Sequence, residues 1–126
     1  MSVSVAILQQ GDNLIASVQS DLTDSQVLAL RDMLSERVGH CRARGLVIDV
    51  TALDVIDSFV ARALRSIALT ARLRGAKTML VGIQPDVAIA MVQFRLNLEP
   101  LQAALDLDGA LAVLDSQTQG DGECDR

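Results

Sequence analysis

The sequence has almost no aromatic residues: its 126 residues include two phenylalanines and no tyrosine or tryptophan. Single-stranded nucleic acids are commonly bound by stacking their bases on several aromatic rings, and two phenylalanines are too few for such a platform. Positive charge is also scarce, because 11 Lys and Arg stand against 16 Asp and Glu and the net charge is −5. Binding that depends on neutralising phosphates is therefore not expected, and nucleic acid is not a predicted partner.

Cysteines and long apolar runs are few as well. The two cysteines, Cys41 and Cys124, have no metal-ligand spacing and do not form the disulfide framework typical of small secreted domains. The N-terminus lacks the basic and apolar segments of a signal peptide. No apolar run approaches the roughly 20 residues that span a membrane. We therefore expect a cytoplasmic protein without a membrane segment.

The motifs of common enzyme classes are missing too. There is neither a Gly-x-Ser-x-Gly nucleophile elbow nor a glycine-rich phosphate loop. The single histidine, His40, lies near the end of a predicted helix, where its charge would favour the helix dipole. Asp49, Asp54 and Asp57 could bind a divalent cation, although aspartates at strand ends and caps usually bind backbone donors. We predict no enzyme, no metal site and no cofactor.

Apolar residues make up 50% of the chain, enough for one core of aliphatic side chains. Their spacing predicts two strands followed by alternating helices and strands, which is typical of an α/β fold with a mixed sheet. A Thr-x-x-Gln capping box at Thr23 opens the first helix, and Pro85 suits the first turn of the third. The expected strands are 3–9, 14–19, 46–48, 77–81 and 101–103, and the expected helices are 23–41, 58–74, 85–96 and 108–114.

These elements predict a single domain over residues 1–115. We expect a mixed sheet of four or five strands and about four helices, with one face of the sheet covered by helices. Residues 116–126 are polar and contain glycine, so we predict a disordered tail there.

The most informative segment is Gly45–Phe59, Gly-Leu-Val-Ile-Asp-Val-Thr-Ala-Leu-Asp-Val-Ile-Asp-Ser-Phe. It predicts a buried strand followed by Asp57 and Ser58 at the start of the second helix. Backbone N–H groups at a helix start have no partners within the helix, so a phosphate is favoured there. On a phosphorylated Ser58, Arg62 one turn later would attract the new charge, and Asp54 and Asp57 would oppose it. The simpler alternative is that Asp57 or Ser58 only caps the helix and that Arg62 lies on a solvated face.

Several motifs in this order resemble the STAS (sulfate transporter and anti-sigma factor antagonist) family, and within it the RsbS-type scaffold subunits of the bacterial stressosome. They are Leu46 to Thr51 with Asp54, Val55 to Ala61, Arg74 to Lys77, Gly82 to Pro85 with Val87 and Ala88, and Ala104 to Leu107 with Ala110 and Leu111. Two positions depart from the family. Ala90 stands where related subunits often carry a second acceptor threonine, and Phe94-Arg95-Leu96 stands where a glycine commonly follows the third helix.

The resemblance implies a non-enzymatic single STAS domain that co-assembles with RsbR-type paralogues carrying sensor domains. It implies that the particle holds an RsbT-type serine/threonine switch kinase, which phosphorylates the scaffold under stress and is released, and that an RsbX-type phosphatase reverses this. The implied phosphorylation site is Ser58. The implied partner-binding residues are Asp54, Asp57, Ser58, Phe59 and Arg62.

Two other interpretations remain open. One is a simple anti-sigma factor antagonist that binds an anti-sigma kinase one to one. Those relatives more often carry Asp-Ser-Ser-Gly at the acceptor, whereas Phe59 and Val60 here favour the scaffold type. The other is a small-molecule-binding or enzymatic α/β domain, for which no convergent polar pocket or base–nucleophile pair is evident in the sequence.

Overall fold

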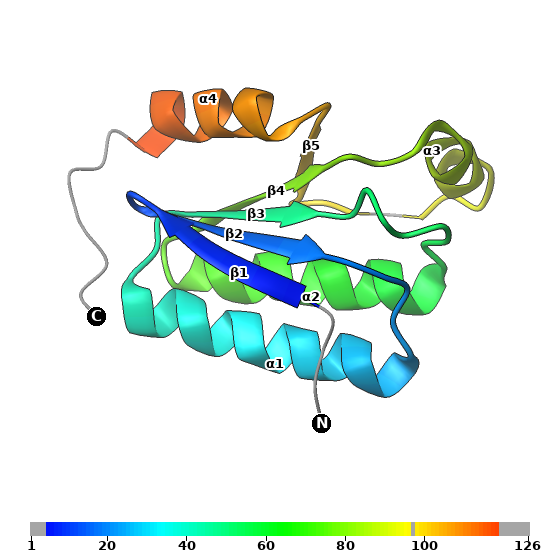
Figure 1. Ribbon diagram of the computed structural model, residues 1–126, viewed down its shortest axis with the longest axis horizontal. Helices are drawn as coiled ribbons and strands as arrows, with labels where there is room; N and C mark the ends of the chain where they lie inside the picture. Colours follow the sequence, from blue (N-terminus) through cyan, green and yellow to red (C-terminus); the bar gives the residue numbers. More distant parts are fainter. Residues whose placement is uncertain (1–4, 97, 119–126) are drawn as a thin grey trace.

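The computed structural model describes residues 5–96 and 98–118 (Figure 1). The strands are β1 Val5–Gln10, β2 Asn13–Val18, β3 Gly45–Asp49, β4 Lys77–Val81 and β5 Gln102–Ala104. The helices are α1 Asp24–Cys41, α2 Ser58–Leu73, α3 Pro85–Gln93 and α4 Leu107–Thr118. Five strands and four helices in this alternating order confirm the predicted α/β class and mixed sheet.

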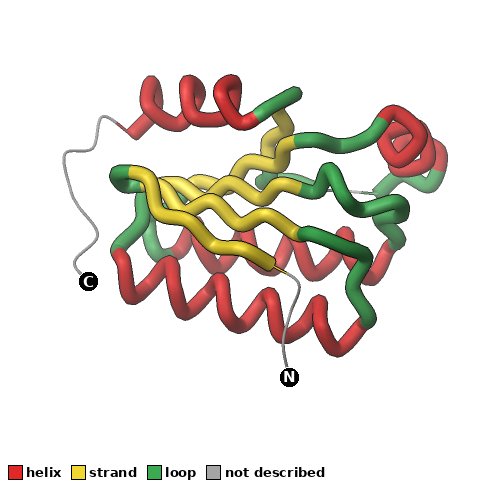
Figure 2. The backbone as a smooth tube through the Cα atoms, in the orientation of Figure 1, coloured by secondary structure: helices red, strands yellow, loops and turns green. Residues whose placement is uncertain are grey.

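The strands form one sheet in the order β1-β2-β3-β4-β5. β1 pairs antiparallel with β2, and every other pair of neighbours is parallel. Gly11 makes the tight turn between β1 and β2 with φ +60°, which costs a glycine little. Parallel neighbours need crossover connections, which α1, α2 and α3 supply. The carboxyl ends of β2, β3 and β4 consequently meet at one edge of the sheet, and each leads into a loop there (Figure 2).

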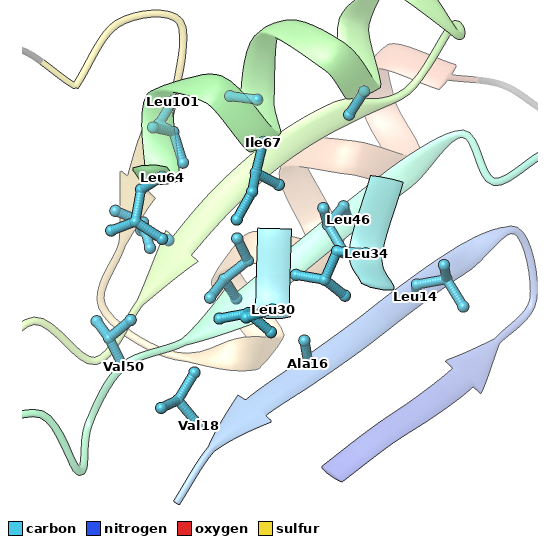
Figure 3. Packing of buried hydrophobic residues seen from close by; sticks show 14 of the residues in the cluster. Leu14, Ala16, Val18, Leu30, Leu34, Leu46, Val50, Leu64, Ile67 and Leu101 are labelled. Carbon is cyan, nitrogen blue, oxygen red and sulfur yellow. The ribbon is translucent and has the colours of Figure 1, made fainter. Parts of the chain in front are cut away.

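Helices α1 and α2 lie side by side across one face of the sheet (Figure 1). Their apolar stripes and the facing strands form the main core, in which Leu34, Leu46 and Ile67 are at most 1% exposed. Figure 3 shows side chains of α1 and α2 gathered with those of β2 and β3 in this cluster. Aliphatic side chains, with Cys41 and Met91, make up the buried residues of this cluster, as the scarcity of aromatics requires.

The opposite face is partly covered by α4, which adds to the predicted arrangement of helices over one face. Ala110 and Leu114 of α4 are fully buried against Val47 and Met79 of the sheet. The sequence predicted a helix only at 108–114, whereas the helix continues to Thr118. Residues 116–118 are thus helical rather than part of the predicted tail, and residues 119–126 lie outside the described residues.

The ends of α1 show one confirmed prediction and one correction. Thr23 Oγ1 accepts from the Gln26 N–H at 3.3 Å, and the Thr23 N–H donates to Gln26 Oε1 at 2.9 Å, which is the predicted capping box. Exposed His40 lies in the last turn. Cys41, the last residue of the helix, is disulfide-bonded, contrary to the expectation of no disulfide. Cys124 lies outside the described residues.

Helix α3 ends three residues before the predicted boundary. Arg95 has φ +53°, and the Leu96 N–H donates to the Met91 carbonyl at 3.0 Å, which closes the helix in the manner of a Schellman motif. A glycine usually takes this left-handed position, and here it is an arginine. Because no glycine marked the end of the helix, the apolar pattern led to a predicted boundary at Leu96. In the described part of the chain, no helix is long and apolar enough to cross a bilayer.

Candidate functional site

Residues 50–57 connect β3 to α2 at the edge where the parallel strands end. Leu53 and Ile56 are buried and anchor this loop to the core, whereas Val55 is 63% exposed. Asp54, Asp57 and Ser58 are exposed. The loop therefore buries Leu53 and Ile56 and presents Val55 and its polar side chains to solvent, immediately before the helix starts.

Hydrogen bonds from neighbouring segments hold the backbone of this loop. Gln84, just before α3, donates from Nε2 to the Thr51 carbonyl at 2.6 Å. Asp21, between β2 and α1, accepts the Asp54 N–H on Oδ1 at 3.0 Å. Asp49, at the end of β3, accepts both the N–H and the hydroxyl of Thr51 on one oxygen, at 2.9 and 2.6 Å. Segments far apart in sequence thus set the position from which α2 begins.

Gly82 permits the close approach of the segment after β4 to this loop. Its φ of +81° lies in the left-handed region, and a Cβ built on it would overlap Thr51 Oγ1 and lie 3.1 Å from Asp49 Oδ1. A side chain at this position would be strained in its backbone and would push the Thr51 hydroxyl away from Asp49. The hydrogen-bonded loop therefore depends on a glycine in the adjacent connection.

The first turn of α2 distinguishes the two residues that the sequence left as alternative caps. Asp57 is the N-cap: its backbone is extended and its Oδ1 accepts the Val60 N–H at 2.9 Å. Ser58 is the first helical residue, and within the described residues its hydroxyl has no hydrogen-bond partner. The N–H groups of Ser58 and Phe59 also have no acceptor among those residues. An unengaged hydroxyl therefore lies beside two free donors at the positive end of the helix.

The remaining predicted site residues lie close to Ser58 along the chain. Arg62 is one turn further on, exposed, and forms no ion pair within 5–96 and 98–118. Phe59 is half-buried. The carboxylates of Asp49 and Asp57 are used to bind Thr51 and to cap α2, so these two aspartates serve local structure.

Comparison with known proteins gives the family. The model of the STAS domain family matches residues 4–108. The chain belongs to the STAS domain family. RsbS of Moorella thermoacetica, in its S58E form, is 33% identical and has a TM-score of 0.78, with 92% of this chain and 98% of that chain covered. A chain in a structure of the stressosome, described as a signal integration and transduction hub, is 31% identical over 91% of this chain and 100% of that one, with a TM-score of 0.71.

A curated relative matches part of this STAS domain. The RsbT co-antagonist protein RsbRA of Bacillus subtilis is 33% identical over 69 residues, which are 55% of this chain and 25% of that protein. The match thus spans a quarter of that relative's length. The comparisons therefore confirm the resemblance to RsbS-type and stressosome STAS domains.

Sequence reasoning missed three residues that shape this STAS site. Gly82 and Gln84 were recognised only as part of a family motif, without a structural role, and Asp21 was not recognised at all. The side chains of Gln84 and Asp21 each bind backbone atoms 33 residues away. No local pattern signals such a contact, although the family motif Gly82 to Pro85 contains two of the three residues.

Proposed function

We propose that this STAS domain is a non-enzymatic scaffold subunit of a stressosome-type particle. It sequesters a serine/threonine switch kinase and releases the kinase when Ser58 is phosphorylated, and so controls a stress-response pathway. The observation that carries this proposal is the state of Ser58: its exposed hydroxyl has no partner in the part of the chain that the structure describes, and it directly follows an aspartate that already caps the helix. Modification of such a hydroxyl does not require the helix to unravel.

The similarity to RsbS supports the assignment. This chain covers 98% of the Moorella protein at 33% identity, and that protein's S58E form carries glutamate in place of a serine numbered 58. Glutamate introduces a negative charge, as phosphorylation does, although phosphate adds about −1.5 to −2. Ser58 of this chain has the same number and lies at the start of a helix, where a negative charge is stabilised.

Phosphorylation would change the charge of the surface that we assign to partner binding. That surface comprises Asp54, Asp57, Ser58, Phe59 and Arg62. The free N–H groups of Ser58 and Phe59 and the guanidinium of Arg62 favour a phosphate, whereas the two aspartates repel it. The surface becomes markedly more negative without refolding of α2. A kinase docked against the neutral surface loses affinity through repulsion and the bulk of the new group.

The proposed partners are an RsbR-type paralogue, an RsbT-type kinase and an RsbX-type phosphatase, in the cytoplasm. The likeness to a stressosome chain and to RsbRA, which is named an RsbT co-antagonist, supports the first two. Large exposed apolar side chains offer area for assembly with paralogues, among them Leu8 at 61%, Val92 at 78% and Phe94 at 74% exposure.

Mass spectrometry after incubation with an RsbT-type kinase and ATP tests the switch. We expect one phosphate per chain on Ser58, and none on Ser58→Ala. Ser66→Ala, a serine in the same helix that is half-buried, is the matched control and should be phosphorylated like the wild type. Ala90 offers no second acceptor in α3. A phosphate on any other residue, or its persistence in Ser58→Ala, would contradict the proposal.

Particle size separates this function from that of a simple anti-sigma factor antagonist. Light scattering on a mixture with the RsbR-type paralogue should give a large particle that contains both chains. A small complex that forms only with an anti-sigma kinase, in a one-to-one ratio, would favour the antagonist instead.

A further inference from the structure

A cleft of about 1070 Å³ lies at the end of α2 opposite to Ser58. It is bounded by the second half of α2, the start of β4 and residues 99–102. The pairing of β4 with β5 begins at Met79, so Lys77 and Thr78 at the start of β4 have no strand beside them on that side. The shortness of β5 therefore leaves a hollow between the sheet edge and α2.

Positive charge is concentrated in this cleft although the chain as a whole is acidic. Four of the 11 Lys and Arg residues line it, together with one of the 16 acidic residues. The basic residues are Arg44, Arg65, Arg72 and Lys77. Like charges around one hollow repel one another, and this cost is relieved when an anion lies between them.

Three of these cations are available to a ligand. Arg65 donates from Nε to the Glu99 carbonyl at 2.9 Å, which fixes its guanidinium beside the cleft. Arg72 lies two turns further along the same stripe of α2. Within the described ranges, Arg65, Arg72 and Lys77 form no ion pair with a carboxylate.

Thr78 gives a second, independent indication. This residue lines the cleft and is 3% exposed, and its Oγ1 has no hydrogen-bond partner within residues 5–96 and 98–118. Buried hydroxyls are nearly always hydrogen-bonded, so an unpaired one beside a cationic hollow indicates a missing polar partner. Leu69 and Leu101 form an apolar part of the wall of the same cleft.

We propose that this cleft binds a small organic phosphate. Its phosphate oxygens accept hydrogen bonds from Arg65 and Arg72 and from the Thr78 hydroxyl, and its carbon part packs on Leu69 and Leu101. Guanidinium groups bind phosphate oxygens in a bidentate, charge-assisted manner, which suits two arginines on one helix stripe. Ser58 and Arg72 are 14 residues apart, roughly 21 Å along the helix, so this site does not rest on the proposed switch.

Isothermal titration calorimetry on the full chain tests the proposal, with ADP, fructose 1,6-bisphosphate and inorganic pyrophosphate as probes. We expect saturable binding of at least one of the two organic phosphates, at one per chain and more tightly than pyrophosphate. Amide shifts in two-dimensional NMR should move at Gly75 and Thr78 and stay fixed at Ser58. No saturable binding by any of the three probes would overturn the proposal, as would pyrophosphate binding as tightly as the better organic phosphate.

Variants distinguish a specific binding site from non-specific electrostatic attraction. Arg72→Gln and Thr78→Val should each weaken binding of the organic phosphate at least tenfold. Arg37→Gln removes the same charge from an exposed position outside the cleft and should leave affinity unchanged. Equal weakening by Arg37→Gln and Arg72→Gln would overturn the proposal. Thr78→Val preserves side-chain volume, and an unchanged thermal midpoint shows that any loss of binding is not a loss of fold.

Discussion

The two ends of α2 differ in charge and in what supports them. The N-terminal end is acidic, and its loop is held by hydrogen bonds from side chains of other segments. The C-terminal end is basic and borders a hollow left by a short edge strand. Between the two ends the buried face consists of four alanines, Leu64 and Ile67, so the middle of the helix packs closely and is fully committed to the core. A helix anchored by its middle leaves both ends available for separate chemistry.

The largest expected effect is a loss of stability when a buried side chain in the middle of α2 is truncated, because both ends of the helix depend on that packing. Ile67 is 1% exposed in the main core, so Ile67→Ala should lower the free energy of unfolding by about 3 kcal/mol through lost burial and a cavity. Urea denaturation measures this loss. Leu73→Ala, in the same helix at 89% exposure, is the control and should change stability by less than about 0.5 kcal/mol. A loss below about 1 kcal/mol for Ile67→Ala would mean that α2 is anchored elsewhere.

The next largest effect should differ between the two ends of α2, and one glycine near each end allows the comparison. Gly82→Ala combines an unfavourable positive φ with an overlap at Thr51, so we expect a loss of about 2 kcal/mol. Gly75, after the C-terminal end of α2, also has a positive φ, but nothing lies within 4 Å of a Cβ built there. Gly75→Ala should therefore cost only the backbone strain, about 1 kcal/mol.

Urea denaturation and NMR measure this pair of variants. Amide shifts in Gly82→Ala should change at Thr51 and Ser58 and remain unchanged at Lys77. Equal losses for the two glycine variants would show that contact with Thr51 does not matter and that the loop is held without it.

The same contrast shows what the sequence can and cannot predict. The capping box at Thr23, the strand Lys77–Val81 and the helix start at Ser58 follow from local patterns, and the structure has all three. The family motifs identified the STAS domain. The bond from Gln84 to Thr51 and that from Arg65 to Glu99 join residues more than 30 positions apart, and they exist only once the strand order is set.

The cationic cleft could not be predicted from the sequence either, because it too is formed by residues that only the fold brings together. Arg65 and Arg72 show helical spacing, but Lys77 and Thr78 join them only through the topology of the sheet. The cleft also depends on β5 being three residues long, and strand ends are poorly marked by periodicity. The end of α3 at Arg95 is a further example, because a left-handed arginine gives no signal where a glycine would.

The smallest expected change in the free energy of unfolding shows whether Ser58 contributes to capping the N-terminal end of α2. Asp57 accepts the Val60 N–H, so Asp57→Ala should lower the free energy of unfolding by about 1 kcal/mol. Ser58 has an exposed hydroxyl without a partner in the described chain, so Ser58→Ala should change it by less than about 0.5 kcal/mol. Thermal and urea unfolding of both variants against the wild type give the comparison. Equal losses would assign Ser58 a share of the cap, and its hydroxyl would then not be free for a phosphate without cost to the helix.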